Sequence, residues 1–162
     1  MKQILLTQGQ YAIVDDADYD RLNRWKWHAR KEGLNFYAAR NPPKNNQNKA
    51  KIYMARQILG LEYGDPREAD HIKHNTLDNR RSELRICTHQ QNMRNRRSFL
   101  NKTSRFKGIN WCKRLKNWQV AIRANGKIIY LGRFKDEKEA ALVYNTAAKK
   151  YYGKFAYLNK TA

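Results

Sequence analysis

A strict alternation of residue types around an Asn-Gly pair most constrains the fold of this chain. From Trp118 to Arg123, apolar residues alternate with other residues at a period of two, which is typical of a strand with one buried face. The alternation resumes over residues 128–131, after Asn125-Gly126, a pair that strongly favours a two-residue hairpin turn. Together with a strand beginning near Lys107, the pattern predicts three antiparallel strands.

A helix is predicted directly after these strands, from about 137 to 151. Asp136 is a suitable N-cap, an apolar stripe follows at helical spacing, and Gly153 ends the helix. One helix covers only one face of a three-stranded sheet. The other face should therefore stay open, and we expect it to carry Lys107, Gln119, Arg123 and Tyr130.

The first part of the chain predicts a mixture of short strands and helices. Residues 2–6 and 10–14 read as a hairpin, and the aspartates from Asp15 onward can cap a helix to about Lys26. Further strands are predicted at 27–30, 36–40 and 52–54, with a short helix at 55–60. The fold class expected for the whole chain is α+β.

Positive charge is concentrated in the middle of the chain. The formal net charge is +20, and residues 71–135 hold 17 lysines and arginines but only two acidic residues. Aromatic and branched apolar residues are interleaved with these charges, which favours a folded, polyanion-binding segment over a disordered tail. RNA binding fits this charge as well, but double-stranded DNA better suits a sheet of major-groove width.

The pair Asp70-His71 begins a spaced set of polar residues that continues to Asn92. A carboxylate beside an imidazole, with a carboxamide some twenty residues on, can supply a metal ligand, a general base and a second ligand. Thr88 and Gln91 fit a capping box for the helix that carries Asn92. Asn75, Asp78 and Asn79 are expected to brace the intervening loop by Asx-type hydrogen bonds.

Residues 69–97 resemble the HNH motif of phage and intron-encoded homing endonucleases, through the run Asp-His-Ile-x-x-Asn-x-x-Asp-Asn-Arg. The resemblance implies a ββα-metal (His-Me finger) fold, with His71 as the general base that activates water. It implies that Asp70 and Asn92 hold a single divalent ion, Mg²⁺ or Mn²⁺. The implied activity is hydrolysis of a DNA phosphodiester, by a homing-type or phage nicking enzyme.

Position 83 departs from that resemblance. Similar nucleases read Asn-Leu-Arg where this chain reads Glu83-Leu84-Arg85, and an ionised Glu accepts hydrogen bonds but cannot donate them. Glu83 could loosen the loop that holds His71, or add a carboxylate at the catalytic centre. Ala55 is a milder departure, from a usual Met-His-Arg run. The alternative function is therefore a DNA-binding protein with a weak or inactive nuclease site.

Residues 104–159 resemble the Apetala-two/ethylene-response-factor DNA-binding domain. Ser-Arg-Phe-Lys-Gly-Ile, Trp118, Ala-Ile-Arg, Tyr-Leu-Gly-Arg-Phe and Phe-Ala-Tyr-Leu-Asn follow one another in the expected order. We expect the sheet to enter the major groove and phosphates near the cut to be held by basic residues. The candidate DNA contacts are Arg94, Arg96, Arg97, Lys107, Asn110, Lys113, Gln119, Arg123 and Tyr130.

These observations predict an HNH domain at 1–97 with its core at about 69–97, a linker at 98–104, and a DNA-binding domain at 105–162. Cys87 and Cys112 have no metal-binding spacing, so free thiols in a reducing cytoplasm are expected. No apolar run is long enough to suggest a membrane partner, and nothing implies a protein partner.

Overall fold

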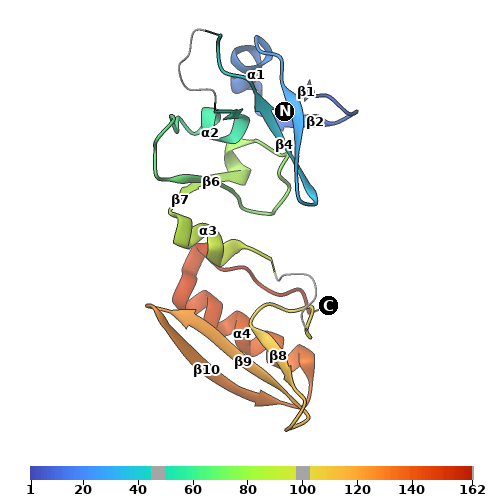
Figure 1. The fold of residues 1–162 in the computed structure, drawn as a ribbon, viewed down its shortest axis with the longest axis vertical. Coiled ribbons are helices and arrows are strands. Elements are labelled where there is room, and N and C mark those ends of the chain that lie inside the picture. Colours follow the sequence, from blue (N-terminus) through green and yellow to red (C-terminus); the bar gives the residue numbers. More distant parts are fainter. Residues whose placement is uncertain (45–49, 98–102, 162) are drawn as a thin grey trace. The chain divides into compact units, whose positions relative to one another are not determined.

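The computed structural model describes residues 1–44, 50–97 and 103–161 of the chain (Figure 1). They form two compact units, Met1–His89 and Gln90–Ala162. Each unit combines small antiparallel sheets with helices, which agrees with the predicted α+β class. Among the described residues, no helix is both long and apolar enough to cross a membrane.

The first unit begins with the predicted hairpin and helix. Strands β1 (Lys2–Leu5) and β2 (Tyr11–Val14) pair antiparallel, and α1 (Asp16–Asn23) follows. Gln8 and Gly9 both adopt positive φ in the connection. The helix is shorter than predicted, and the Asp15 side chain makes no capping hydrogen bond in it. That carboxylate instead accepts a bond from the backbone N–H of Arg81, 2.8 Å away.

A second sheet completes the scaffold of this unit. Strands β3 (His28–Glu32), β4 (Asn35–Arg40) and β5 (Ile52–Tyr53) lie in that order, and α2 (Met54–Ile58) follows. Leu22 of α1 and Met54 of α2 are fully buried in the shared core. Burial of each such side chain contributes about 1.5–3 kcal/mol, so the core holds these short elements together.

Two further strands, β6 (Glu68–His71) and β7 (Leu84–Cys87), form a ribbon in the first unit, and α3 (His89–Asn95) follows in the chain. The loop between β6 and β7 is anchored to the rest of the unit. Ile13 donates its N–H to Leu77 O and accepts from Asn79 N–H, at 2.9 and 2.8 Å. Thr76 donates its hydroxyl to Phe36 O at 2.6 Å.

The turn at the end of this loop, the short 3₁₀ helix η1 (Arg81–Glu83), is also tied to the scaffold. Arg81 donates two hydrogen bonds to the buried carboxylate of Asp18, at 2.8 and 2.9 Å. Burial works to raise the pKa of Asp18, but the bonds from Arg81 and Arg21 outweigh it and hold that pKa below its ordinary value. The loop is therefore fixed at several points along its length.

The second unit contains the predicted three-stranded sheet on one helix (Figure 1). Strands β8 (Ile109–Cys112), β9 (Asn117–Ala124) and β10 (Lys127–Phe134) are antiparallel, with β9 in the centre. Asn125 and Gly126 have positive φ, as the predicted hairpin turn requires. Helix α4 (Glu137–Tyr152) is capped by Asp136, which accepts the Glu139 N–H, and ends at Gly153.

The core of this unit lies between one face of the sheet and α4. Val120 and Ile122 are buried there against Ala140, Tyr144 and Ala148. Any side chain at position 108 would collide with the ring of Tyr144, which explains the glycine. The C-terminal segment returns across this unit, and buried Asn159 bonds to both backbone groups of Lys107 and to the Asn145 side chain.

The predicted linker at 98–104 falls mostly on residues 98–102, which lie outside the described residues, so the predicted domain boundary stays a prediction. The boundary between the two compact units comes earlier, after His89, so most of α3 belongs to the second unit. Both cysteines are free thiols, as expected; Cys87 is buried and Cys112 half-buried.

Candidate functional site

Asp70 and His71 occupy the last two positions of β6, and both are buried. They pair with Arg85 and Leu84 of β7, the antiparallel neighbour. Because successive residues of a strand point to opposite faces, the carboxylate and the imidazole leave the ribbon on different sides. The end of this ribbon thus carries a carboxylate on one face and an imidazole on the other.

The orientation of the His71 ring is set by Asn79, from the loop between the two strands. Asn79 Oδ1 lies 3.3 Å from His71 Nε2, and Asn79 Nδ2 donates to Leu77 O at 3.2 Å. The bond to Leu77 fixes which end of the amide faces the ring. His71 Nε2 must therefore be the donor, and Nδ1 is the unprotonated nitrogen of the neutral ring.

Burial also favours the neutral form of His71. Desolvation lowers the pKa of the imidazole below its ordinary value, although Asn79, Asp70 and Asp78 act in the opposite direction. The ring of Tyr37, from β4, packs edge-on against the imidazole with centroids 6.2 Å apart. A neutral imidazole with a defined tautomer is the form that can accept a proton from water.

The carboxylate of Asp70 is held by an arginine of the paired strand. Arg85 donates from Nε and from one terminal nitrogen to Asp70 Oδ2, at 2.8 and 2.6 Å. Both side chains are largely shielded from solvent, so this ion pair is stronger than a surface pair. The sequence interpretation did not assign Arg85 this role; its place directly opposite Asp70 becomes evident only from the strand register.

Glu83 has a partner of its own. Its side chain is 11% exposed and accepts a hydrogen bond from Lys73 Nζ at 2.6 Å, while its backbone O accepts the Ile72 N–H at 2.9 Å. The Glu83 carboxylate thus pairs with a cation where the two ends of the β6–β7 loop meet. Asx-type bonds from Leu77 to Asn75 and from Arg80 to Asp78 brace the loop as predicted.

Asn92 lies on α3, most of which belongs to the second unit. Among the described residues, no three His, Cys, Asp or Glu side chains gather closely enough to hold a metal ion. A site of one carboxylate and one carboxamide suits Mg²⁺, which commonly keeps several waters and takes its remaining ligands from substrate phosphates. The donor types of Asp70 and Asn92 fit such an ion.

In the second unit, the open face of the sheet brings together four of the nine predicted DNA contacts. The register places Asn110 opposite Gln119, and Gln119 opposite Arg133. Further along the strands, Ala121 lies opposite Tyr130, and Arg123 opposite Ile128. Arg123, Tyr130 and Arg133 are exposed. The alternation predicted Gln119, Arg123 and Tyr130 on this face, and Asn110 was predicted separately as a DNA contact. The alternation did not identify Arg133, because a bulge between Tyr130 and Gly132 shifts the register.

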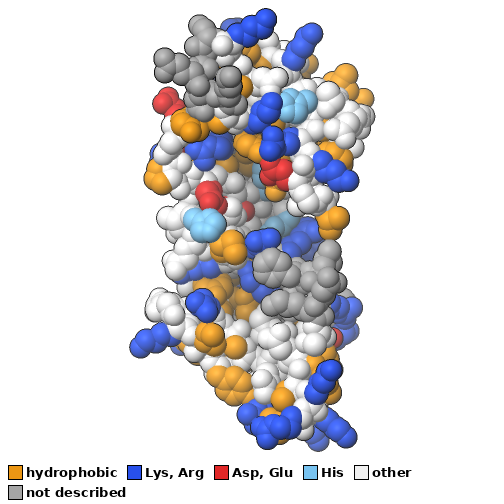
Figure 2. All heavy atoms as spheres, in the orientation of Figure 1, with side chains coloured by type: hydrophobic (Ala, Val, Ile, Leu, Met, Phe, Trp, Pro, Cys, Tyr) orange, Lys and Arg blue, Asp and Glu red, His pale blue; other side chains and the backbone are white. Residues whose placement is uncertain are grey.

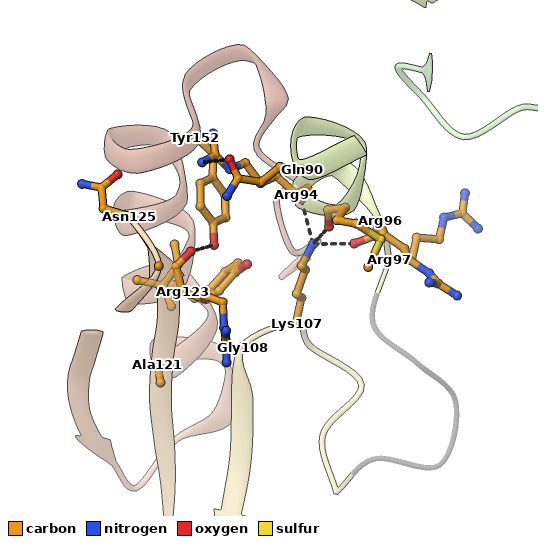
Figure 3. Close-up of a pocket in the computed structure, with 14 residues that line it drawn as sticks. Gln90, Arg94, Arg96, Arg97, Lys107, Gly108, Ala121, Arg123, Asn125 and Tyr152 are labelled. Carbon is orange, nitrogen blue, oxygen red and sulfur yellow. Dashed lines mark hydrogen bonds between the residues drawn. The ribbon is translucent and has the colours of Figure 1, made fainter. Parts of the chain in front are cut away.

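Lys107 occupies a different place from the one predicted. It precedes β8, and its ammonium donates to three backbone carbonyls at the end of α3: Met93 O at 3.2 Å, and Arg94 O and Arg96 O at 2.7 Å each (Figure 3). Burial lowers the pKa of Lys107 to about 8. A cation here complements the carbonyl end of a helix, so Lys107 fastens α3 to the second unit.

A groove of about 520 Å³ lies beside this contact, between the end of α3 and the β9–β10 hairpin. Arg94 stacks over the ring of Tyr152, whose hydroxyl donates to Arg123 O (Figure 3). Arg96 and Arg97 border the groove and are exposed, with side chains that extend away from Tyr152. Lys113 is exposed just after β8.

The second unit carries most of the positive charge. Residues 90–162 hold 18 lysines and arginines and three acidic residues, and all three acidic residues lie at the start of α4. In Figure 2, blue Lys and Arg side chains outnumber red acidic ones on the face in view. Few carboxylates within this unit can therefore pair with its lysines and arginines, and the resulting excess of positive charge favours binding to a polyanion.

No family model matches the chain. Its sequence is similar to that of a protein from Acanthamoeba polyphaga mimivirus whose name is "uncharacterized HNH endonuclease". The two sequences are 29% identical over 155 residues, which cover 94% of this chain and 76% of the viral protein. The similarity therefore includes both the Asp70-His71 region and the second unit. It supports a distant relationship to HNH endonucleases.

Proposed function

We propose that this protein is an HNH-type endonuclease that hydrolyses a phosphodiester bond of double-stranded DNA, as a homing or phage nicking enzyme does. The observation that carries the proposal is His71: a buried, neutral imidazole whose tautomer is fixed by Asn79 and whose chain neighbour is the carboxylate of Asp70. The name of the viral relative points to the same activity.

In the proposed reaction, His71 Nδ1 accepts a proton from a water molecule. The water oxygen attacks the phosphorus, and the bond from phosphorus to the 3′ oxygen breaks. Asp70 and Asn92 would hold one Mg²⁺ or Mn²⁺, which when bound supplies charge stabilisation for the phosphate and the leaving oxygen. Asn79 keeps the base in its productive tautomer throughout.

Binding to DNA is assigned to the second unit. We propose that the open face of β8–β10 enters the major groove, with Arg123 on guanine edges or phosphates and Asn110, Gln119 and Tyr130 nearby. Arg94, Arg96, Arg97 and Lys113 would contact phosphates. The charge of this unit supports the assignment. Lys107 also stays a predicted DNA contact, although its ammonium already has three carbonyl partners.

A second candidate is a DNA-binding protein with a weak or silent nuclease site. The observation that favours it is Glu83, at the position where the HNH resemblance implies Asn. This candidate predicts tight, salt-sensitive DNA binding without cleavage. This candidate assumes that Glu83 loosens the loop beside His71. The Lys73–Glu83 ion pair weakens that assumption, because it gives the Glu83 carboxylate a partner.

Cleavage of supercoiled plasmid tests the proposal. Wild-type protein should nick or linearise the plasmid with Mg²⁺ or Mn²⁺ and should be inactive with EDTA. His71→Ala and Asp70→Asn, purified in the same way, should be at background. If wild type and H71A give equal background with every metal while both bind DNA tightly, the second candidate replaces the first. Mapping the cut strands then separates nicking from double-strand cleavage.

A further inference from the structure

Two consecutive residues after His71 are held by one residue, Glu83. The backbone N–H of Ile72 donates to Glu83 O at 2.9 Å, and the ammonium of Lys73 donates to Glu83 Oε1 at 2.6 Å. Glu83 in turn precedes Leu84, the strand partner of His71. The two contacts thus join both ends of the β6–β7 loop, directly beside the proposed general base.

The two side chains of this ion pair differ greatly in exposure. The Lys73 side chain is 76% exposed, whereas that of Glu83 is 11% exposed. A carboxylate this far from water needs a donor or a cation, because burial without one disfavours the charged form. An ionised Glu has no hydrogen to donate, so the loop cannot be bridged by Glu83 alone. Lys73 supplies the missing donors and the opposite charge.

We propose that Lys73 is a positioning residue of the nuclease site, because its ammonium pairs with Glu83 and so holds together the two ends of the β6–β7 loop, next to His71. The inference rests on the proposed function for its catalytic consequence, but its structural content concerns Lys73, Glu83 and Ile72 alone. Lys73 and Glu83 act as a pair at the position where similar nucleases have a single Asn.

A simpler role for an exposed lysine in a DNA-binding protein is a phosphate contact. The two roles predict different kinetics. Loss of a phosphate contact weakens DNA affinity and reduces the salt dependence of binding. Loss of a positioning residue lowers kcat and leaves both the dissociation constant for DNA and its salt dependence unchanged.

The test compares Lys73→Met, Lys73→Arg and the double variant Lys73→Met/Glu83→Gln with wild type. We expect K73M to lower kcat about tenfold or more without changing DNA affinity, since it removes the hydrogen bond and the ion pair that Lys73 gives to a largely buried carboxylate. K73R should keep the ion pair and the activity. The double variant should recover most of the activity, because it also removes the largely buried charge of Glu83. Lys31→Met, at an exposed position of β3, is the matched control.

A second measurement does not depend on activity. Hydrogen exchange at the Ile72 amide, which donates to Glu83 O, should be about tenfold faster or more in K73M and near wild type in the double variant. The proposal is overturned if K73M matches wild type in both measurements, or if the double variant stays as impaired as K73M. Absence of cleavage by wild type would instead refute the proposed function, and the exchange data would still decide the role of Lys73.

Discussion

Asn79 and His71 form the contact on which the candidate site depends: the amide oxygen lies 3.3 Å from Nε2, at a position where Asn79 is almost fully buried. Asn79→Leu keeps the size of the side chain but removes the acceptor. General-base catalysis contributes roughly 10²–10⁴-fold, and we expect N79L to lose about tenfold or more of it. Single-turnover cleavage, with DNA affinity measured in parallel, checks this.

Asn75→Ala is the control for that experiment, because Asn75 is exposed and lies in the same loop. It should leave kcat within about twofold, since it removes an exposed and long hydrogen bond, from the Leu77 N–H at 3.4 Å, and leaves the Asn79–His71 contact in place. Equal losses in both variants would mean that loop integrity, and not the tautomer of His71, governs the rate.

The pH dependence of cleavage should report the lowered pKa of His71. The base is active when unprotonated, so the rate should rise with pH through a pKa below the ordinary 6.5 and be level at neutral pH. The same lowered pKa also makes the stability of the fold depend on pH. Between the folded pKa and 6.5 the unfolded chain binds more protons, so stability rises with pH and is lost as pH falls through this window.

Urea unfolding of wild type and His71→Gln across pH 5–7 measures this contribution. Below pH 6.5 the free energy of unfolding should change more steeply with pH in the wild type than in H71Q, because Gln does not titrate. Parallel curves for the two proteins would contradict a depressed pKa at His71.

Local sequence signals anticipated much of the architecture. Asn125-Gly126 and the alternation beside it predicted the β9–β10 hairpin, and Asp136 and Gly153 bounded α4, because these signals act through neighbouring residues. The partners within the site were not predictable in this way. Asp70–Arg85 follows from strand register, and Lys73–Glu83 from loop closure, so both depend on the three-dimensional path of the chain.

Arg85 should oppose metal binding at the Asp70 carboxylate, because it places a positive charge beside that group. Arg85→Gln is expected to tighten Mn²⁺ or Mg²⁺ binding about tenfold, because it removes the Coulomb repulsion between the guanidinium and the ion. It should also lower stability by about 1–3 kcal/mol through lost hydrogen bonds. Calorimetric titration with Mn²⁺ tests the first effect; weaker binding in R85Q would show that Arg85 instead orients Asp70 for the ion.

Lys107 should matter for stability more than for contact with DNA. Lys107→Met removes three hydrogen bonds to the end of α3, and we expect a loss of about 1–3 kcal/mol in the stability of the second unit. The salt dependence of DNA binding should match that of wild type at a temperature where both are folded. A reduced salt slope with an unchanged melting temperature would assign Lys107 to the phosphates instead.

Arg123 and Arg133 share the open face of the sheet, and both should contact DNA although only Arg123 was predicted from the alternation. If either contacts a phosphate, its replacement by Gln should weaken binding to all sequences and reduce the slope of log K against log salt by about one. If it contacts a base, the loss in binding free energy should be about 1–3 kcal/mol on the specific site and small on other DNA.

Lys149→Gln, which removes an exposed charge on α4, is the matched control. An equal effect of K149Q and the two arginine variants would show that affinity follows net charge, and the sheet face would lose its assignment as the DNA-reading surface.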